Sequence, residues 1–222
     1  PAYKIASFEI TDIPLIEYVA SKGKPIILST GIATNEDIEL ALDACRRMGN
    51  NDIALLKCTS SYPAPIEEAN MCMIEDLAKR YNVITGLSDH TIGSTVPIVA
   101  TSFGAKIIEK HFILDKSIGG ADASFSMDEI DFTEMVKAVR EAESAIGNVD
   151  YTLTEKQIKG KDCSRSLYIV KDVKVGDEIT NENVRSIRPG FGLHPKYLSE
   201  IIGKEFMGDF KKGTRLSLEL IK

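Results

Sequence analysis

The first 147 residues alternate short apolar runs with amphipathic segments, and this alternation restricts the chain to few folds. Runs with strand character lie at residues 3–7, 25–29, 53–58, 81–84 and 105–109. Segments with helical spacing follow them at residues 14–22, 35–45, 71–80, 96–100 and 131–146. A strand that returns parallel to its neighbour needs a crossover, so the alternation predicts an α/β fold with a five-stranded parallel sheet.

Two architectures satisfy this pattern, a doubly wound open sheet and a (β/α)8 barrel. A closed barrel usually needs about 250 residues, whereas only five strand–helix units fit before Gly147. An open half-barrel would expose two long strand edges, which invite pairing with other chains. We therefore expect either a five-stranded open sheet or part of a barrel whose other units lie upstream.

The character of the sequence changes after residue 149. Residues 150–163 are polar and are expected to form a linker. Beyond them, short strand-like pieces are separated by turn signals such as Val175-Gly176-Asp177. These pieces lie at residues 166–170, 179–180, 184–187 and 214–220. The expected organisation is an α/β domain at 1–149, a linker at 150–163 and a small β-rich domain at 164–222.

Composition excludes several classes of function. The net charge is −6 and no basic stripe appears, which argues against nucleic acid as a partner. No apolar run reaches the roughly 20 residues that span a bilayer, and no leader-like segment opens the sequence. The four cysteines match neither a zinc module nor a CxxC pair. We expect free thiols in a reducing compartment, the cytoplasm.

Two histidines follow successive strand runs. His90 comes after the strand that leads into Gly86-Leu87-Ser88-Asp89, and His111 comes after the strand at 105–109. Ligands of parallel α/β proteins gather beyond the carboxyl ends of the strands. Both imidazoles could therefore face one transition ion such as manganese, with Asp89 and Glu109 as further ligands or anchors. The alternative is two unrelated histidines with local hydrogen bonds.

A second set of polar residues lies in or just beyond the strands. Hydroxyl groups and a lysine at one rim can hold a carboxylate or phosphate, although serine and threonine also simply begin turns. Lys4 and Lys57 lie within apolar strands, where an unpaired ammonium is costly. Residues 119–124 form a polar Gly-Gly loop that could close over a substrate. The members of the set are Lys4, Ser7, Ser29, Thr30, Ser60 and Ser88.

Six ordered motifs resemble the sialic acid synthase family across nearly the whole chain. They are Tyr3-Lys4-Ile5-Ala6-Ser7, Leu28-Ser29-Thr30-Gly31, Lys57-Cys58-Thr59-Ser60-Ser61-Tyr62-Pro63, Gly86-Leu87-Ser88-Asp89-His90-Thr91, Glu109-Lys110-His111-Phe112 and Arg188-Pro189-Gly190. Within the family, residues 61–65 and 119–126 look most like pseudaminic acid synthases.

The resemblance implies a particular fold. Residues 1–149 would be the C-terminal part, strands four to eight, of a TIM (β/α)8 barrel. Residues 164–222 would be a small antifreeze-like SAF domain of the β-clip type. The family's first three units, with a catalytic glutamate and a lysine for phosphoenolpyruvate, would precede Pro1. We expect the isolated 222-residue chain to be aggregation-prone or inactive.

The resemblance also implies an activity, which is condensation of phosphoenolpyruvate with an N-acetylated amino sugar and release of phosphate. The sugar would be 2,4-diacetamido-2,4,6-trideoxy-altrose and the product pseudaminic acid. His90 and His111 would hold a divalent metal, Mn²⁺ first, with Mg²⁺ or Co²⁺ as alternatives. His90, His111 and Lys4 would be catalytic. The substrate-binding residues would be Lys4, Ser7, Ser29, Ser60, Tyr62, Ser88, Asp122 and Arg188.

Two features of the resemblance bear on substrate and assembly. Ser60 replaces the asparagine expected in synthases that use N-acetylmannosamine, which favours a different amino sugar. Arg188 of the small domain would reach the sugar in the partner subunit of a head-to-tail homodimer. The alternatives are an N-acetylneuraminate or legionaminate synthase, a metal-dependent pyruvate aldolase, and, if the chain is complete, a non-catalytic sugar- or partner-binding protein.

Overall fold

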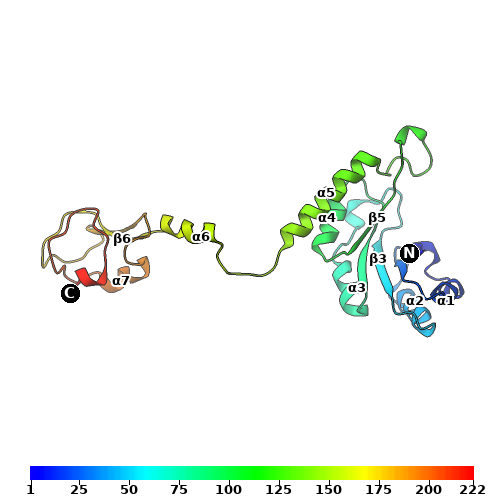
Figure 1. Cartoon of the computed structure of the whole chain (residues 1–222), viewed down its shortest axis with the longest axis horizontal. Helices are drawn as coiled ribbons and strands as arrows, with labels where there is room; N and C mark the ends of the chain where they lie inside the picture. The colour runs from blue at the N-terminus through cyan, green and yellow to red at the C-terminus, as the bar shows by residue number, and fades with distance from the viewer. The chain divides into compact units, whose positions relative to one another are not determined.

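The computed structural model describes every residue from Pro1 to Lys222. The chain divides into two compact units, residues 1–148 and 149–222, each with its own core (Figure 1). No helix is both long enough and apolar enough to cross a membrane. The two units are therefore described one at a time.

The first unit is built on a five-stranded parallel sheet, as the alternation of strands and helices predicts. The strands are β1 (Tyr3–Ile5), β2 (Ile26–Ser29), β3 (Ile53–Cys58), β4 (Ile84–Asp89) and β5 (Ile107–Lys110). Their order in the sheet is β1-β2-β3-β4-β5. A doubly wound sheet reverses its strand order, whereas a barrel adds each strand beside the last. The sequential order identifies a curled half-barrel.

Five helices connect and follow the strands (Figure 1). They are α1 (Ile13–Ala20), α2 (Asn35–Arg47), α3 (Met73–Tyr81), α4 (Thr95–Ser102) and α5 (Glu129–Ile146). Thr34 begins α2 with a capping box, because its hydroxyl accepts from Asp37 N while Asp37 accepts from Thr34 N. The helices cover one face of the sheet and leave the other face concave.

Side-chain alternation along the strands separates these two faces. Ile5, Leu28 and Leu55 point toward α1 and α2 and form one core with Ile16 and other helix residues. A second core joins Leu87 of β4 to Ile74 of α3 and Ala100 of α4. The residues between them along each strand therefore point to the concave face, where Lys4, Ser29 and Ser88 lie.

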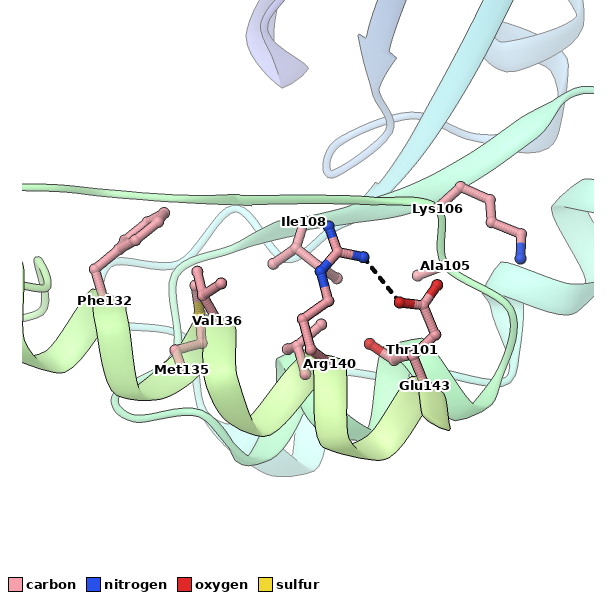
Figure 2. Close-up of a pocket in the computed structure, with 10 residues that line it drawn as sticks. Thr101, Ala105, Lys106, Ile108, Phe132, Met135, Val136, Arg140 and Glu143 are labelled. Carbon is pink, nitrogen blue, oxygen red and sulfur yellow. Dashed lines mark hydrogen bonds and ion pairs between the residues drawn. The ribbon is translucent and has the colours of Figure 1, made fainter. Parts of the chain in front are cut away.

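A cavity of about 230 Å³ lies between α5 and β5 (Figure 2). Ile108, Phe132, Met135 and Val136 form its apolar wall, and Arg140 pairs with Glu143 at 2.8 Å beside it. It is on the helix-covered side of the sheet, and no candidate site residue lines it. The cavity is thus separate from the concave face.

The fourth strand lies later than the sequence predicts. Residues 81–84 were expected to be strand, but α3 continues through Tyr81, and Asn82 then adopts a left-handed conformation with φ 51°. Tyr81 is buried in the helix-side core, which favours keeping it in the helix. The strand is Ile84–Asp89 instead, so Ser88 and Asp89 are strand residues rather than turn residues.

Gly86 shows why glycine is needed within β4. A Cβ atom at this position would lie 2.3 Å from the carbonyl oxygen of Ile107 and 2.7 Å from Leu56 Cδ2. We expect Gly86→Ala to lower the free energy of unfolding by about 1–3 kcal/mol, because the clash is with backbone. Urea unfolding followed by circular dichroism measures it.

A matched control is Gly160→Ala. Gly160 has φ −62° and a Cβ there would meet no atom within 4 Å, so its replacement should be neutral or slightly stabilising. Equal unfolding midpoints for Gly86→Ala and the wild type would contradict the close approach of β4 and β5.

The second unit contains one antiparallel pair, β6 (Ser166–Ile169) with β7 (Val184–Ile187). Short helices α6 (Glu155–Gly160) and α7 (Leu198–Ile201) flank them. The expected strands at 179–180 and 214–220 do not form: Glu178 makes an isolated bridge just before the first, and in the second Arg215 makes one ahead of a 3-10 turn at Leu218–Leu220. Leu167, Ile169, Ile179 and other apolar side chains fill a compact core that holds these irregular segments.

Candidate active site

The candidate residues of the first unit gather where its strands end. Lys4 lies in β1 and Ser29 ends β2, while Ser88 lies in β4. His90 directly follows β4 and His111 directly follows β5. The parallel strands bring all five side chains to the carboxyl edge of the concave face, as predicted for two histidines at successive strand ends.

The two histidine rings face each other. Their centroids lie 5.2 Å apart and their planes are inclined by 69°. Tyr62 lies against His90, with 4.2 Å between centroids, and Phe125 lies against His111 at 5.0 Å. These four rings, Tyr62, His90, His111 and Phe125, form what we call the aromatic box. Sequence reasoning missed Phe125 as a site residue, since a phenylalanine in a polar loop carries no signal of its own.

His90 is oriented by its neighbours. Its Nδ1 lies 2.9 Å from the carbonyl oxygen of Thr59, which can only accept, so Nδ1 carries a proton and Nε2 is the nitrogen left to face the site. Burial would lower the pKa of His90, but hydrogen bonds with the Cys58 thiol and the Thr59 carbonyl raise it above its ordinary value. Burial favours the neutral thiol, yet contact with His90 keeps the pKa of Cys58 below its usual range.

His111 has a different environment. Its Nδ1 lies 3.5 Å from Asp122 Oδ2, in the Gly-Gly loop that the sequence predicted could close over a substrate. Burial and the neighbouring charge of His90 lower the pKa of His111. The ring is therefore neutral at pH 7, which is the form that binds metals.

The histidines fit a divalent ion as a partial ligand set. The structure holds no group of three or more histidine, cysteine, aspartate or glutamate side chains placed to bind one ion. Two imidazoles, each binding through a deprotonated nitrogen, can nevertheless contribute to a site whose other positions are taken by water or substrate oxygens. Glu109 and Asp89, expected as further ligands or anchors, have other partners.

Lys4 reaches across the concave face. Its Nζ lies 3.3 Å from Glu109 Oε1, which also accepts a hydrogen bond of 2.7 Å from the Ser88 hydroxyl. Because β1 and β5 are opposite edges of the sheet, this ion pair requires the sheet to be strongly curled. Lys4 is thus a paired cation with a third of its side chain exposed.

Hydroxyl groups line the same face between β1 and β3. The Ser60 hydroxyl lies 2.9 Å from the Ser7 hydroxyl, which accepts a hydrogen bond from Ile32 N. Gly31 makes this contact possible, because a Cβ there would lie 2.1 Å from Ser60 Oγ. Ser29 is 1% exposed, and its hydroxyl makes no hydrogen bond within the chain. The face therefore offers a free buried donor on β2, the strand next to the one that carries Lys4.

Arg188 belongs to the second unit and directly follows β7. The loop after it is tied to β6, since the Ser166 hydroxyl donates to Pro189 O at 2.7 Å and accepts from Gly192 N at 2.8 Å. The ion pairs of this unit join Lys171 to Glu182 and Lys211 to Asp172. Arg188 takes part in neither, so its guanidinium is not committed to a carboxylate of the unit.

Both units match known sequence families. Residues 1–151 match the NeuB family, and residues 164–222 match the SAF domain. The chain is 47% identical over 223 residues to the pseudaminic acid synthase of Helicobacter pylori, covering 100% of this chain and 66% of that protein. It is 34% identical to the N,N'-diacetyllegionaminic acid synthase of Legionella pneumophila, covering 99% and 63%.

The fold of the chain is also similar to that of a solved structure. The crystal structure of the spore coat polysaccharide biosynthesis protein SpsE of Bacillus subtilis matches with a TM-score of 0.63 at 33% identity, covering 100% of this chain and 67% of that one. The chain thus spans about two thirds of the length of these proteins. Their names concern sugar acids and polysaccharides.

Proposed function

The chain belongs to the NeuB family, and we propose that the protein condenses phosphoenolpyruvate with an N-acetylated amino sugar to give a nine-carbon sugar acid and phosphate. The observation that carries the proposal is the facing pair His90 and His111 on the concave face of the half-barrel. Identity of 47% to pseudaminic acid synthases supports 2,4-diacetamido-2,4,6-trideoxy-altrose as the sugar. Ser60, in place of the asparagine of the N-acetylmannosamine type, supports the same choice.

We propose that His90 and His111 hold a divalent ion, Mn²⁺ first, which supplies Lewis acidity toward the sugar carbonyl when bound. His90 Nε2 is available because Nδ1 is occupied by Thr59 O, and His111 is neutral. Tyr62 and Phe125 would shield this end of the site from water, because their rings lie against the two imidazoles.

The phosphoenolpyruvate would lie along the hydroxyl-lined side of the concave face. Lys4 provides the positive charge, and the unpartnered Ser29 hydroxyl provides a donor already buried and aimed at no group of the chain. Fixed donors of this kind stabilise charge without reorganisation during the reaction. Ser7, Ser60 and Ser88 would complete the contacts, and Asp122 would bind the sugar.

The proposed reaction joins the two substrates, consumes one water and releases one phosphate. The methylene carbon of phosphoenolpyruvate forms a bond to the aldehyde carbon of the sugar, and the aldehyde oxygen takes a proton. Water then adds at carbon two, and cleavage of the carbon–oxygen bond releases phosphate. Lys4 and the hydroxyl groups would hold the carboxylate and phosphate through these steps.

An assay with two alternative donors tests the proposal in the full-length protein. With phosphoenolpyruvate and the diacetamido sugar, we expect one phosphate released for each sugar consumed. With pyruvate and the same sugar, we expect no condensation. His111→Ala serves as the inactive control. Condensation with pyruvate would instead identify a metal-dependent aldolase, and activity with neither donor would leave a sugar-binding protein.

We also propose a homodimer in which the second unit completes the site of the partner. Lysine and arginine outnumber aspartate and glutamate in residues 149–222, whereas residues 1–148 are strongly acidic. This difference favours association between unlike units. Arg188, uncommitted within its own unit, is the residue proposed to contact the sugar.

The four cysteines form no disulfide, which supports placing the reaction in the cytoplasm.

A further inference from the structure

A buried ion pair joins β4 to β5 next to the two histidines. Lys110 Nζ lies 2.6 Å from Asp89 Oδ2, and the two side chains are 1% and 2% exposed. Asp89 and Lys110 are directly paired in the β4–β5 ladder. They are also the last residues of the two strands, so His90 and His111 each follow immediately.

The pair lies on the opposite face of the sheet from the histidines. Side chains alternate along a strand, and Ser88 and Glu109, one residue earlier, meet on the concave face at 2.7 Å. Asp89 and Lys110 therefore point to the helix-covered side. The carboxylate of Asp89 consequently does not reach an ion between the imidazoles, which departs from the expectation that it could be a ligand.

Every polar atom of the pair has a partner. The Lys110 ammonium donates to Asp89, to the carbonyl of Thr91 and, at 2.9 Å, to the carbonyl of Gly93. Asp89 also accepts from Thr91 N at 2.9 Å and from the Thr91 hydroxyl at 3.1 Å. All three ammonium protons are used, so Lys110 has none left for a substrate.

These bonds close the backbone around His90. The Lys110 ammonium binds the segment from Asp89 to Gly93 through the carbonyls of Thr91 and Gly93. The carbonyl of His90, within the same segment, accepts a hydrogen bond from Ala64 N at 2.9 Å. Lys110, which precedes His111, is thereby bonded to Asp89 and Thr91, the two residues that flank His90. A change in the contact between Asp89 and Lys110 is therefore expected to move one histidine relative to the other.

We propose that Asp89 and Lys110 are positioning residues that set the separation and orientation of His90 and His111. The inference rests on the proposed function insofar as the two imidazoles are taken to share one ion. A buried pair adds little stability compared with apolar residues of the same size, so its use here is better explained by the geometry it imposes. Interactions beyond the ligands themselves commonly orient those ligands and change the affinity of the site for its metal.

The histidine count makes a direct test possible. The chain has three histidines, and His194 lies in the second unit, where its Nδ1 accepts from Lys196 N. Imidazole ¹H–¹⁵N spectra of the metal-free full-length protein therefore contain few signals from this chain to assign, with His194 as internal reference. The variants are Asp89→Asn, which keeps size and an oxygen for Thr91, and Lys110→Met, which keeps length without charge.

Leu42→Ala is the matched control, because Leu42 is 1% exposed in the core between β1–β3 and the helices, away from both histidines. It loses stability without touching the ion pair. We expect the His90 and His111 signals to move in both ion-pair variants, while the His194 signals stay and Leu42→Ala moves none of them. Mn²⁺ affinity should fall about 10–100-fold in the ion-pair variants only.

Unchanged His90 and His111 signals in folded Asp89→Asn would overturn the inference, since the pair would then contribute stability alone. Equal shifts in Leu42→Ala would overturn it as well. If Lys110→Met does not fold, Asp89→Asn decides. If the wild-type protein binds no Mn²⁺, the proposed metal site is wrong, while the imidazole signals still decide whether the pair positions the rings.

Discussion

His90→Ala and His111→Ala will each lower the affinity of the full-length protein for Mn²⁺ by about 10–100-fold or more. The centroids of the two rings lie 5.2 Å apart on the concave face. Each ring has one nitrogen, Nε2, that is not engaged by the contacts of its Nδ1. Removing either one leaves a single imidazole, which is a weak ligand for a divalent ion. Synthase activity should fall with the metal.

Metal content after dialysis, measured by elemental analysis, reports the affinity directly. His194→Ala is the control, because it removes the same side chain from the second unit, where the ring only caps a short turn at Pro195–Tyr197. Wild-type metal content in the His90→Ala/His111→Ala double variant would refute the assignment. A drop in the His194→Ala protein would point to a site in the second unit.

Arg188→Ala will reduce activity strongly without unfolding the second unit. The guanidinium can offer paired donors to the acyl oxygen or hydroxyl groups of a sugar, and lysine cannot reproduce this fork. Its loop stays anchored through Ser166 and Pro189, which do not depend on the arginine side chain. We therefore expect Arg188→Ala to keep the melting temperature of the wild type and to have a lower kcat/KM for the sugar. The kcat/KM of Arg188→Lys should lie between those of Arg188→Ala and the wild type.

Mixed dimers test whether Arg188 acts on the partner's site. His111→Ala and Arg188→Ala proteins are each expected to be nearly inactive alone. After subunit exchange, a mixed dimer regains one intact site, built from His111 of one chain and Arg188 of the other. The control is each variant alone, taken through the same exchange procedure. If exchange is verified and no activity returns, Arg188 serves its own chain or has no part in the site.

The sequence by itself determined most of the strands and helices of the first unit, and the family. The apolar stripe of α2 and the strand at Ile53–Cys58 follow from short-range patterns, and the structure confirms them, although the cap of α2 is Thr34 and not Asn35, which the sequence had favoured. The parallel sheet is confirmed as well. The motifs around His90 and His111 identified the family, because residue types at fixed spacing are a property of the chain alone.

Tertiary structure decided which residues meet. Residues 81–84 resemble a strand, but Tyr81 is buried as the last residue of α3, and the strand begins only at Ile84. Residues 214–220 resemble a strand too, yet the compact core of the second unit leaves them as a single bridge and a turn. In both places, packing against distant residues outweighed the local preference.

The site itself depends on the curl of the sheet. Lys4 and Glu109 are 105 positions apart in the numbering and lie on opposite edge strands, so only the curled sheet brings them within 3.3 Å. Phe125 enters the aromatic box from a loop, and Asp89 turns away from it because strand residues alternate between two faces. Which side chains face one another is a long-range property, because it follows from strand order and curvature rather than from any local pattern.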